Sequence, residues 1–187
     1  MTQPFKAPDR LLMGPGPSNV APEVLSASAQ TTIGHLDPAF QAMMEEVKDL
    51  LRYAFQTKNP VTFPISAPAS LAMESGLVNV LEPGDTAIIA QNGVFGGRMA
   101  DIVGRCGAKC VLVETDWGKP VDLDKVAEAI KAHPEAKLLG FVHAETSTGA
   151  QSDAASLAKM ASDAGMLSLM DTVTGLGGVP VRVDDWG

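Results

Sequence analysis

The carboxylate of Asp171 is the strongest candidate in this sequence for a residue that does chemistry. Asp171 ends a short apolar run, residues 166–170, and hydroxyls and glycines follow it through Gly178. An acid at the end of a buried strand needs a partner, because an unpaired buried charge is costly. Ligands of open α/β sheets bind at the carboxyl ends of the strands. Asp171 is therefore the first candidate functional residue, and the alternative is that it caps the following turn.

A run of small residues, Ser-Ala-Pro-Ala-Ser at 66–70, precedes a predicted helix. Small residues let a backbone approach an anion, and a helix N-terminus offers free N–H groups to it. This run is therefore a candidate phosphate cradle, although Pro68 has no N–H to donate. Small residues are also common at helix starts, so an ordinary helix start is the competing interpretation.

Two more loops carry suitable side chains. Phe95 follows a predicted strand and could stack on a flat ring, or it could belong to the core. Residues 143–149, His-Ala-Glu-Thr-Ser-Thr-Gly, place hydroxyls and an acid after another strand, or form a capped turn into the next helix. Together these loops offer an anion cradle, a stacking ring, hydroxyl donors and an acid. Pyridoxal phosphate needs such a set, because its pyridine nitrogen requires a carboxylate for the ring to act as an electron sink.

The elements that must position these residues alternate along the chain. A helix from Pro38 to Phe55 is predicted, because Asp37 can cap it and apolar residues recur at helical spacing. A short helix near 24–30 precedes it. Beyond these, strands are predicted near 61–65, 86–90, 110–114, 138–143 and 167–170, and helices near 70–81, 94–106, 122–132 and 153–165. This alternation predicts an α/β fold of three layers, with a mostly parallel sheet between helices.

Composition narrows the class of protein. The 187 residues are 45% hydrophobic and 19% charged, which is typical of one globular domain with a substantial core. A net charge of −8 argues against nucleic-acid binding. No apolar run reaches the about 20 residues of a membrane span, and no signal-peptide core begins the chain, so a cytoplasmic protein is predicted. Cys106 and Cys110 have no second pair of ligands nearby, so no metal site is predicted.

Six segments resemble one known family when they are taken together. They are residues 11–20, 34–38, 79–85, 92–96, 143–149 and 171–178, and they span almost the whole chain in the family's order. The sequence resembles the class V aminotransferases, in particular the serine–glyoxylate and alanine–glyoxylate (serine–pyruvate) group. The resemblance implies the large-domain portion of the fold-type I aminotransferase architecture, truncated, and pyridoxal 5'-phosphate as the cofactor.

The resemblance also implies a role for each matching residue. Asp171 pairs with the pyridine nitrogen. Val173 packs on the face of the ring opposite Phe95. Thr146 hydrogen-bonds the phenolic oxygen. Backbone N–H groups of Ala69 and Ser70, with the Ser70 hydroxyl, bind the phosphate.

The same resemblance implies a substrate loop, a domain organisation and a partner. Gly14, Pro15 and Gly16 belong to a loop of the substrate pocket. Residues 1–22 form an N-terminal arm with that loop, and residues 23–187 form the N-terminal part of the large cofactor-binding domain, without the C-terminal domain. A homodimer, or a second chain carrying the C-terminal part, is expected as the partner.

Two departures from the family pattern matter. Relatives usually have Ser-Gly-Ser/Thr-Gly in the phosphate loop, and this sequence has Ser-Ala-Pro-Ala at 66–69. The Schiff-base lysine of the family is expected beyond Gly187, so no catalytic residue is nominated among the lysines present. The sequence therefore indicates the N-terminal portion of an enzyme that moves an amino group from serine or alanine to glyoxylate or pyruvate, inactive as this chain alone. A non-catalytic fragment that binds the cofactor or a partner, and a lyase or desulfurase of the same fold, remain as alternatives.

Overall fold

The computed structural model describes residues 3–187. The chain forms two compact units, Met1–Ala42 and Met43–Gly187. In the first unit, α1 spans Pro22–Ser28, and every described residue up to 39 is exposed. The Gly-Pro-Gly-Pro loop of this unit is closed by Asn19, whose side chain accepts from the N–H of Leu12 (2.8 Å) and donates to the carbonyl of Arg10 (2.9 Å).

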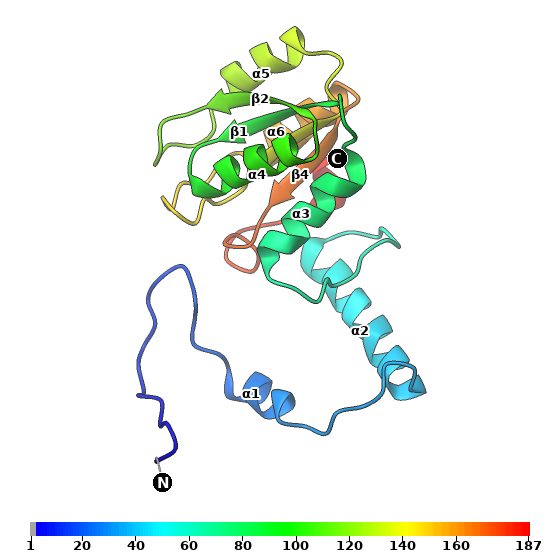
Figure 1. Ribbon diagram of the computed structural model, residues 1–187, viewed down its shortest axis with the longest axis vertical. Helices are drawn as coiled ribbons and strands as arrows, with labels where there is room; N and C mark the ends of the chain where they lie inside the picture. Colours follow the sequence, from blue (N-terminus) through cyan, green and yellow to red (C-terminus); the bar gives the residue numbers. More distant parts are fainter. Residues whose placement is uncertain (1–2) are drawn as a thin grey trace. The chain divides into compact units, whose positions relative to one another are not determined.

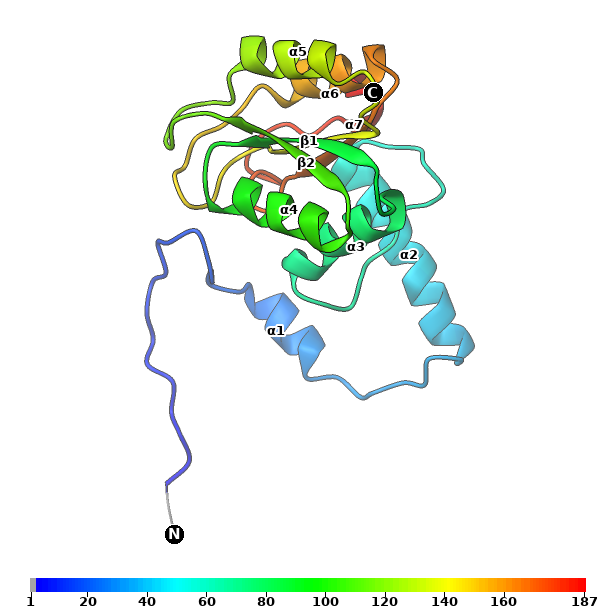
Figure 2. The same cartoon turned by 45° about the horizontal axis from the view of Figure 1, so that its top comes forward.

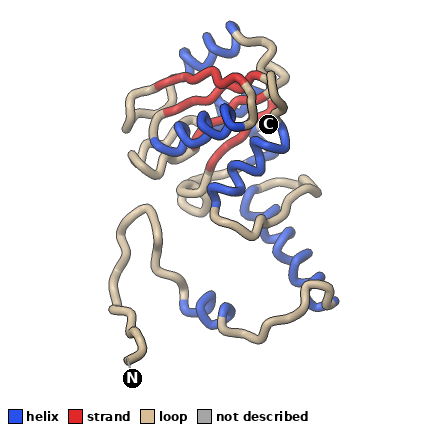
Figure 3. The backbone as a smooth tube through the Cα atoms, viewed as in Figure 1, coloured by secondary structure: helices blue, strands red, loops and turns tan. Residues whose placement is uncertain are grey.

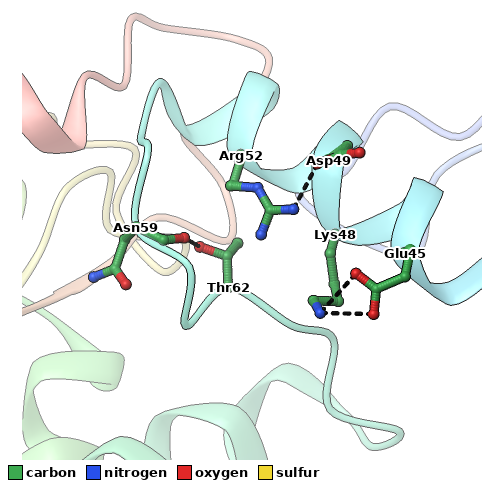
Figure 4. A network of polar contacts seen from close by, with 6 residues as sticks. All are labelled: Glu45, Lys48, Asp49, Arg52, Asn59 and Thr62. Atoms are coloured by element: carbon green, nitrogen blue, oxygen red, sulfur yellow. Dashed lines mark hydrogen bonds and ion pairs between the residues drawn. The ribbon is translucent and has the colours of Figure 1, made fainter.

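Helix α2 spans Pro38–Phe55. The Asp37 carboxylate accepts the N–H of Ala39 at 2.8 Å, so the predicted cap is confirmed. Figure 4 shows the polar side of this helix, where Lys48 pairs with Glu45 (2.9 Å) and Arg52 with Asp49 (2.5 Å). Pairs of this kind, three residues apart and open to water, contribute little stability each.

A parallel sheet organises the second unit (Figure 1). Its strands are β1 (Thr86–Gln91), β2 (Lys109–Glu114), β3 (Leu138–Val142) and β4 (Leu167–Asp171), in the order β2-β1-β3-β4. The helices of this unit are α3 (Ala69–Val80), α4 (Val94–Arg105), α5 (Leu123–Ala132), α6 (Ala154–Asp163) and the short α7 (Val183–Trp186). All the strand pairs are parallel.

Alternate residues of the strands build two cores. Ile88, Leu139 and Phe141 face one way and pack with α5 and α6. Ile89, Leu138 and Val142 face the other way and pack with α3 and α4. Figure 2 shows the sheet between these two pairs of helices. The predicted three-layer α/β fold is therefore confirmed, and it follows from the two-residue period of a strand covered on both faces.

The strand predicted at 61–65 does not form. This segment is a loop, visible between α2 and α3 in Figure 3, and Val61 and Phe63 are largely exposed. An apolar run becomes a strand only when a neighbouring strand satisfies its backbone groups, and Pro64 within the run lacks an N–H to donate. The prediction was wrong because it rested on composition, which carries no information about pairing.

Every helix between residues 3 and 187 is too short or too polar to span a lipid bilayer.

Candidate functional site

The strand order β2-β1-β3-β4 reverses direction between β1 and β3. Helix α4, which follows β1, covers one face of the sheet, and α6, which follows β3, covers the other. Connections on opposite faces make the carboxyl ends of β1 and β3 a topological switch point, which is where ligands of such sheets bind. Phe95 follows β1 and Thr146 follows β3, so both lie at this switch point.

Asp171 is the last residue of β4, the neighbour of β3. Its backbone carbonyl accepts the N–H of His143 at 2.8 Å, which joins the loop after β3 to the end of β4. Its carboxylate Oδ1 accepts the N–H of Val173 at 3.0 Å, so the capping role considered for Asp171 is also real. Within the described residues no other donor reaches this carboxylate. Asp171 thus retains an oxygen that can accept a hydrogen bond from a ligand.

Burial raises the pKa of the Asp171 carboxyl above its ordinary value. The Val173 N–H and the positive charge of Arg98 oppose this shift, while the negative charge of Glu145 adds to it. An acid in this environment is stabilised as a carboxylate by any cation that binds beside it.

A pocket of about 380 Å³ opens beside Asp171. Its wall combines the first half of α3 with the end of β4 and the turn that follows. Within the part of the chain that the structure describes, Asp171 is the one ionisable side chain that lines the pocket, and most of the rest of the lining is apolar. An apolar cleft with one acid suits a flat ring that carries a basic nitrogen.

Thr146 lies in the loop after β3, and its hydroxyl hydrogen-bonds that of Thr174, three residues after Asp171. This contact holds the loop after β3 against the loop after β4. The Thr146 hydroxyl is partly buried and can both donate and accept.

Phe95 and Ser70 meet through Arg98. The Arg98 guanidinium carbon lies 4.8 Å from the centroid of the Phe95 ring, and the same guanidinium donates to Ser70 Oγ in the first turn of α3. One face of the Phe95 ring is therefore covered by a cation in this structure. Phe95 is partly buried and also packs against the core beneath α4, so the core interpretation holds as well.

Glu145 fastens the start of α4 to the loop after β3. Its side chain is fully buried, and its carboxylate accepts from the N–H of Phe95 (3.2 Å) and from the N–H and hydroxyl of Ser147 (3.1 and 2.8 Å). The Ser147 hydroxyl in turn accepts the N–H of Val94 at 3.1 Å. Gly93, which precedes α4, provides no side chain for capping, so these two residues cap the helix from another loop.

The structure brings the predicted site residues together in two groups. Ala69, Asp171 and Val173 line the pocket. The second group lies outside the pocket lining and consists of Ser70, Phe95 and Thr146. Arg98 contacts Ser70 and Phe95, and Thr174 contacts Thr146. Gly14, Pro15 and Gly16 belong to the first unit, so their role at a substrate pocket stays a prediction.

Sequence reasoning missed Arg98, Glu145 and Thr174. Arg98 follows Phe95 by three residues on a helix, and that spacing alone places both side chains on one face. Glu145 lies inside a segment already noted for its polar residues. The bond from Thr146 to Thr174 joins loops that follow different strands, and no local pattern indicates it.

The two cysteines lie outside the pocket lining. Cys110 is in the first half of β2 and Cys106 follows α4, so neither is at the carboxyl edge of the sheet. Burial raises the pKa of the Cys110 thiol, which makes it a poor nucleophile. Among residues 3–187, no lysine lines the pocket.

Comparison with known proteins identifies similar chains over the whole length. The family model described as aminotransferase class-V matches residues 13–187. The chain is 40% identical over 187 residues to alanine–glyoxylate aminotransferase of Mus musculus, covering 100% of this chain and 45% of that protein. It is 35% identical over 179 residues to (S)-ureidoglycine–glyoxylate transaminase of Bacillus subtilis, covering 96% and 43%.

A solved structure is equally similar. The crystal structure of an alanine–glyoxylate aminotransferase from Nostoc sp. superposes with a TM-score of 0.95 at 44% identity, covering 100% of this chain and 49% of that chain. The chain therefore spans about half the length of the proteins it matches.

Proposed function

The chain belongs to the class V aminotransferase family, and from that premise we propose that its carboxyl-edge loops form part of the pyridoxal 5'-phosphate site of an aminotransferase. The observation that carries the proposal is Asp171, a half-buried acid that lines an apolar pocket and has an oxygen free to accept from a ligand.

The residues present fit this cofactor. A pyridinium nitrogen supplies the cationic donor that the buried Asp171 carboxyl lacks. The apolar lining of the pocket suits a flat ring. The first turn of α3 supplies N–H groups for a phosphate at Ala69 and Ser70.

Each residue has a proposed task. Asp171 holds the proton on the pyridine nitrogen, so that the cofactor, when bound, supplies an electron sink for amino-group chemistry. Phe95 and Val173 enclose the ring from opposite sides. Thr146 donates to the phenolic oxygen, and Thr174 orients that hydroxyl.

The substrates come from the relatives, whose names specify glyoxylate as a substrate. We propose that the whole protein moves an amino group from serine or alanine to glyoxylate or pyruvate. Gly14, Pro15 and Gly16 are proposed to contribute to the substrate pocket. The lysine that holds the cofactor covalently is proposed to lie outside these 187 residues.

The organisation of the whole protein is part of the same proposal. Residues 1–22 are proposed to form an arm, and residues 23–187 the N-terminal part of the large cofactor-binding domain. The proposed partner is a second copy of the chain in a homodimer, or a chain that carries the C-terminal part. A cytoplasmic location stays a prediction from the sequence.

The test compares Asp171→Asn with the wild-type protein. Asparagine keeps the shape but cannot stabilise a protonated pyridine nitrogen, so we expect the dissociation constant for pyridoxal 5'-phosphate to rise about tenfold or more, as for the loss of one charge-assisted hydrogen bond. Titration of the apo-protein by absorbance measures it.

Asp163→Asn, which removes an exposed carboxylate paired with Lys159 on α6, is the control and should bind normally. Equal affinity of the Asp171 variant and the wild type would remove the main support for the proposal.

A further inference from the structure

Arg98 is a cation at this site without an anionic partner. Its guanidinium lies over the Phe95 ring and donates to Ser70 Oγ, a neutral acceptor. Among residues 3–187 no carboxylate lies within ion-pair distance of Arg98, whereas Arg105, two turns further along α4, pairs with Asp101 at 2.8 Å. The same helix thus carries one arginine that is neutralised and one that is not.

The place where Arg98 points is itself positive. Ser70 lies in the first turn of α3, a helix of 12 residues, whose N-terminus carries unsatisfied N–H groups and a partial positive charge. Arg98 is exposed to solvent, and an anion that binds between its guanidinium and the helix N-terminus is attracted by both. This arrangement therefore favours an anion beside Ser70.

Two backbone positions at the start of α3 have no N–H available to such an anion. Pro68, at the N-cap, has no N–H, and no side chain caps the helix. The N–H of Leu71 is already bonded to the carbonyl of Pro68 at 2.9 Å. The guanidinium of Arg98 offers several donors in a planar fork that matches phosphate oxygens.

We propose that Arg98 binds the phosphate group of the cofactor and replaces the donor that Pro68 lacks, an inference that rests on the proposed function. Phosphate is a dianionic acceptor and Ser70 Oγ a neutral one, so the guanidinium binds phosphate more strongly. Packing on Phe95 restricts the guanidinium before the ligand arrives, which lowers the entropy that binding costs.

The experiment measures two ligands that differ only in the phosphate. The apo-form of the full-length natural protein is titrated with pyridoxal 5'-phosphate and with pyridoxal, as the wild type and as Arg98→Gln. We expect Arg98→Gln to weaken pyridoxal 5'-phosphate about tenfold or more and to change pyridoxal less than about twofold. No enzymatic turnover is needed for this readout.

Two further variants complete the test. Arg98→Lys keeps the charge but loses the planar fork, so its preference for the phosphorylated ligand should lie between those of the wild type and Arg98→Gln. This variant decides the matter if Arg98→Gln fails to fold. Arg105→Gln removes a positive charge from the same helix and should leave both affinities unchanged.

Three results would overturn the inference. Equal weakening of both ligands would show that Arg98 acts through Phe95 or through folding. An unchanged pyridoxal 5'-phosphate affinity in both Arg98 variants would show that Arg98 does not contact the phosphate. A wild-type protein that binds neither ligand would overturn the proposed function itself, and with it this inference.

Discussion

The ionised carboxylate of Asp171 is less stable in the folded chain than in water. Its carboxyl is partly removed from solvent, one backbone N–H reaches it, and Glu145 lies close enough to repel its charge. Burial without a full set of partners destabilises the ionised form. In a site that binds a cation, the carboxylate is destabilised in the empty protein and is stabilised again when the cation binds beside it.

The raised pKa of Asp171 gives a prediction about stability and pH. The folded chain holds the Asp171 proton more tightly than the unfolded chain, so this group's contribution to stability is largest at acid pH. That contribution falls as pH rises from the ordinary value of 3.8 through the higher folded value.

Asparagine has no charge to bury, so Asp171→Asn should gain stability relative to the wild type over the same pH range. Urea unfolding of the cofactor-free protein between acid and neutral pH measures the difference. A difference that does not change with pH would contradict the explanation.

At the scale of elements, helix α4 depends on a loop distant in sequence. Phe95 occupies its place because Glu145 and Ser147 accept the first N–H groups of the helix. Positioning of a stacking ring is thus coupled to the loop that carries Thr146. Both proposed cofactor contacts depend on the same buried carboxylate.

Glu145→Gln tests this coupling. Replacing the carboxylate by an amide weakens charge-assisted hydrogen bonds and turns an NH2 group toward other donors, so we expect a loss of about 1–3 kcal/mol in unfolding free energy. Affinity for the cofactor should fall as well, because Phe95 and Thr146 lose their common anchor.

The control for Glu145→Gln is Asp122→Asn at the start of α5, where the Asp122 side chain accepts from Asp124 and Lys125. Asparagine caps helices about as well as aspartate, so this change should have little effect. Similar losses in the two variants would mean that Glu145 is an ordinary cap.

Gly93 shows how closely the two loops approach. A Cβ at this position would lie 2.3 Å from Glu145 Cγ and 2.6 Å from Ser147 Oγ. Gly93→Ala should therefore displace the cap and cost about 1–3 kcal/mol, the usual range for overpacking.

Gly104→Ala in α4 is the matched control, because a Cβ there meets nothing within 4 Å. It should raise stability by about 0.5–1 kcal/mol through helix propensity. Thermal unfolding of both variants checks that Gly93→Ala lowers the stability and that Gly104→Ala raises it. A destabilised Gly104→Ala would contradict this prediction.

At the scale of the whole molecule, residues 3–187 place an acid but no lysine in the pocket, and the ring and the anion-binding turn are proposed cofactor contacts. The chain also spans less than half the length of its curated relatives. We therefore propose that these 187 residues hold the cofactor, and that the lysine that moves protons lies outside them.

A chain of only these 187 residues should not catalyse amino transfer. Circular dichroism first establishes that it is folded, and it is then mixed with pyridoxal 5'-phosphate, serine and glyoxylate. We expect no glycine, because general base catalysis needs a group that can take the proton. The alanine–glyoxylate aminotransferase from Nostoc serves as the positive control, and turnover by the 187-residue chain would refute the prediction.

The sequence predicted most elements of the sheet and its helices well. Strands near 86–90 and 138–143 and helices near 70–81 and 94–106 formed within a residue or so of their predicted bounds. Hydrophobic periodicity is a local property, and so are the caps that end a helix. The segment 61–65 failed because an isolated apolar run does not show whether a neighbouring strand exists.

The sequence by itself determined the kinds of chemical group at the ends of the strands, Asp171 above all, and the order in which the elements follow one another. Only the tertiary structure decided which loops meet. The contacts of Arg98 with Ser70, of Glu145 with Phe95 and of Thr146 with Thr174 join residues at least 28 positions apart. They exist because β3 lies between β1 and β4 in one sheet and α3 and α4 pack on the same face of it, and the period of a single strand or helix does not encode that arrangement.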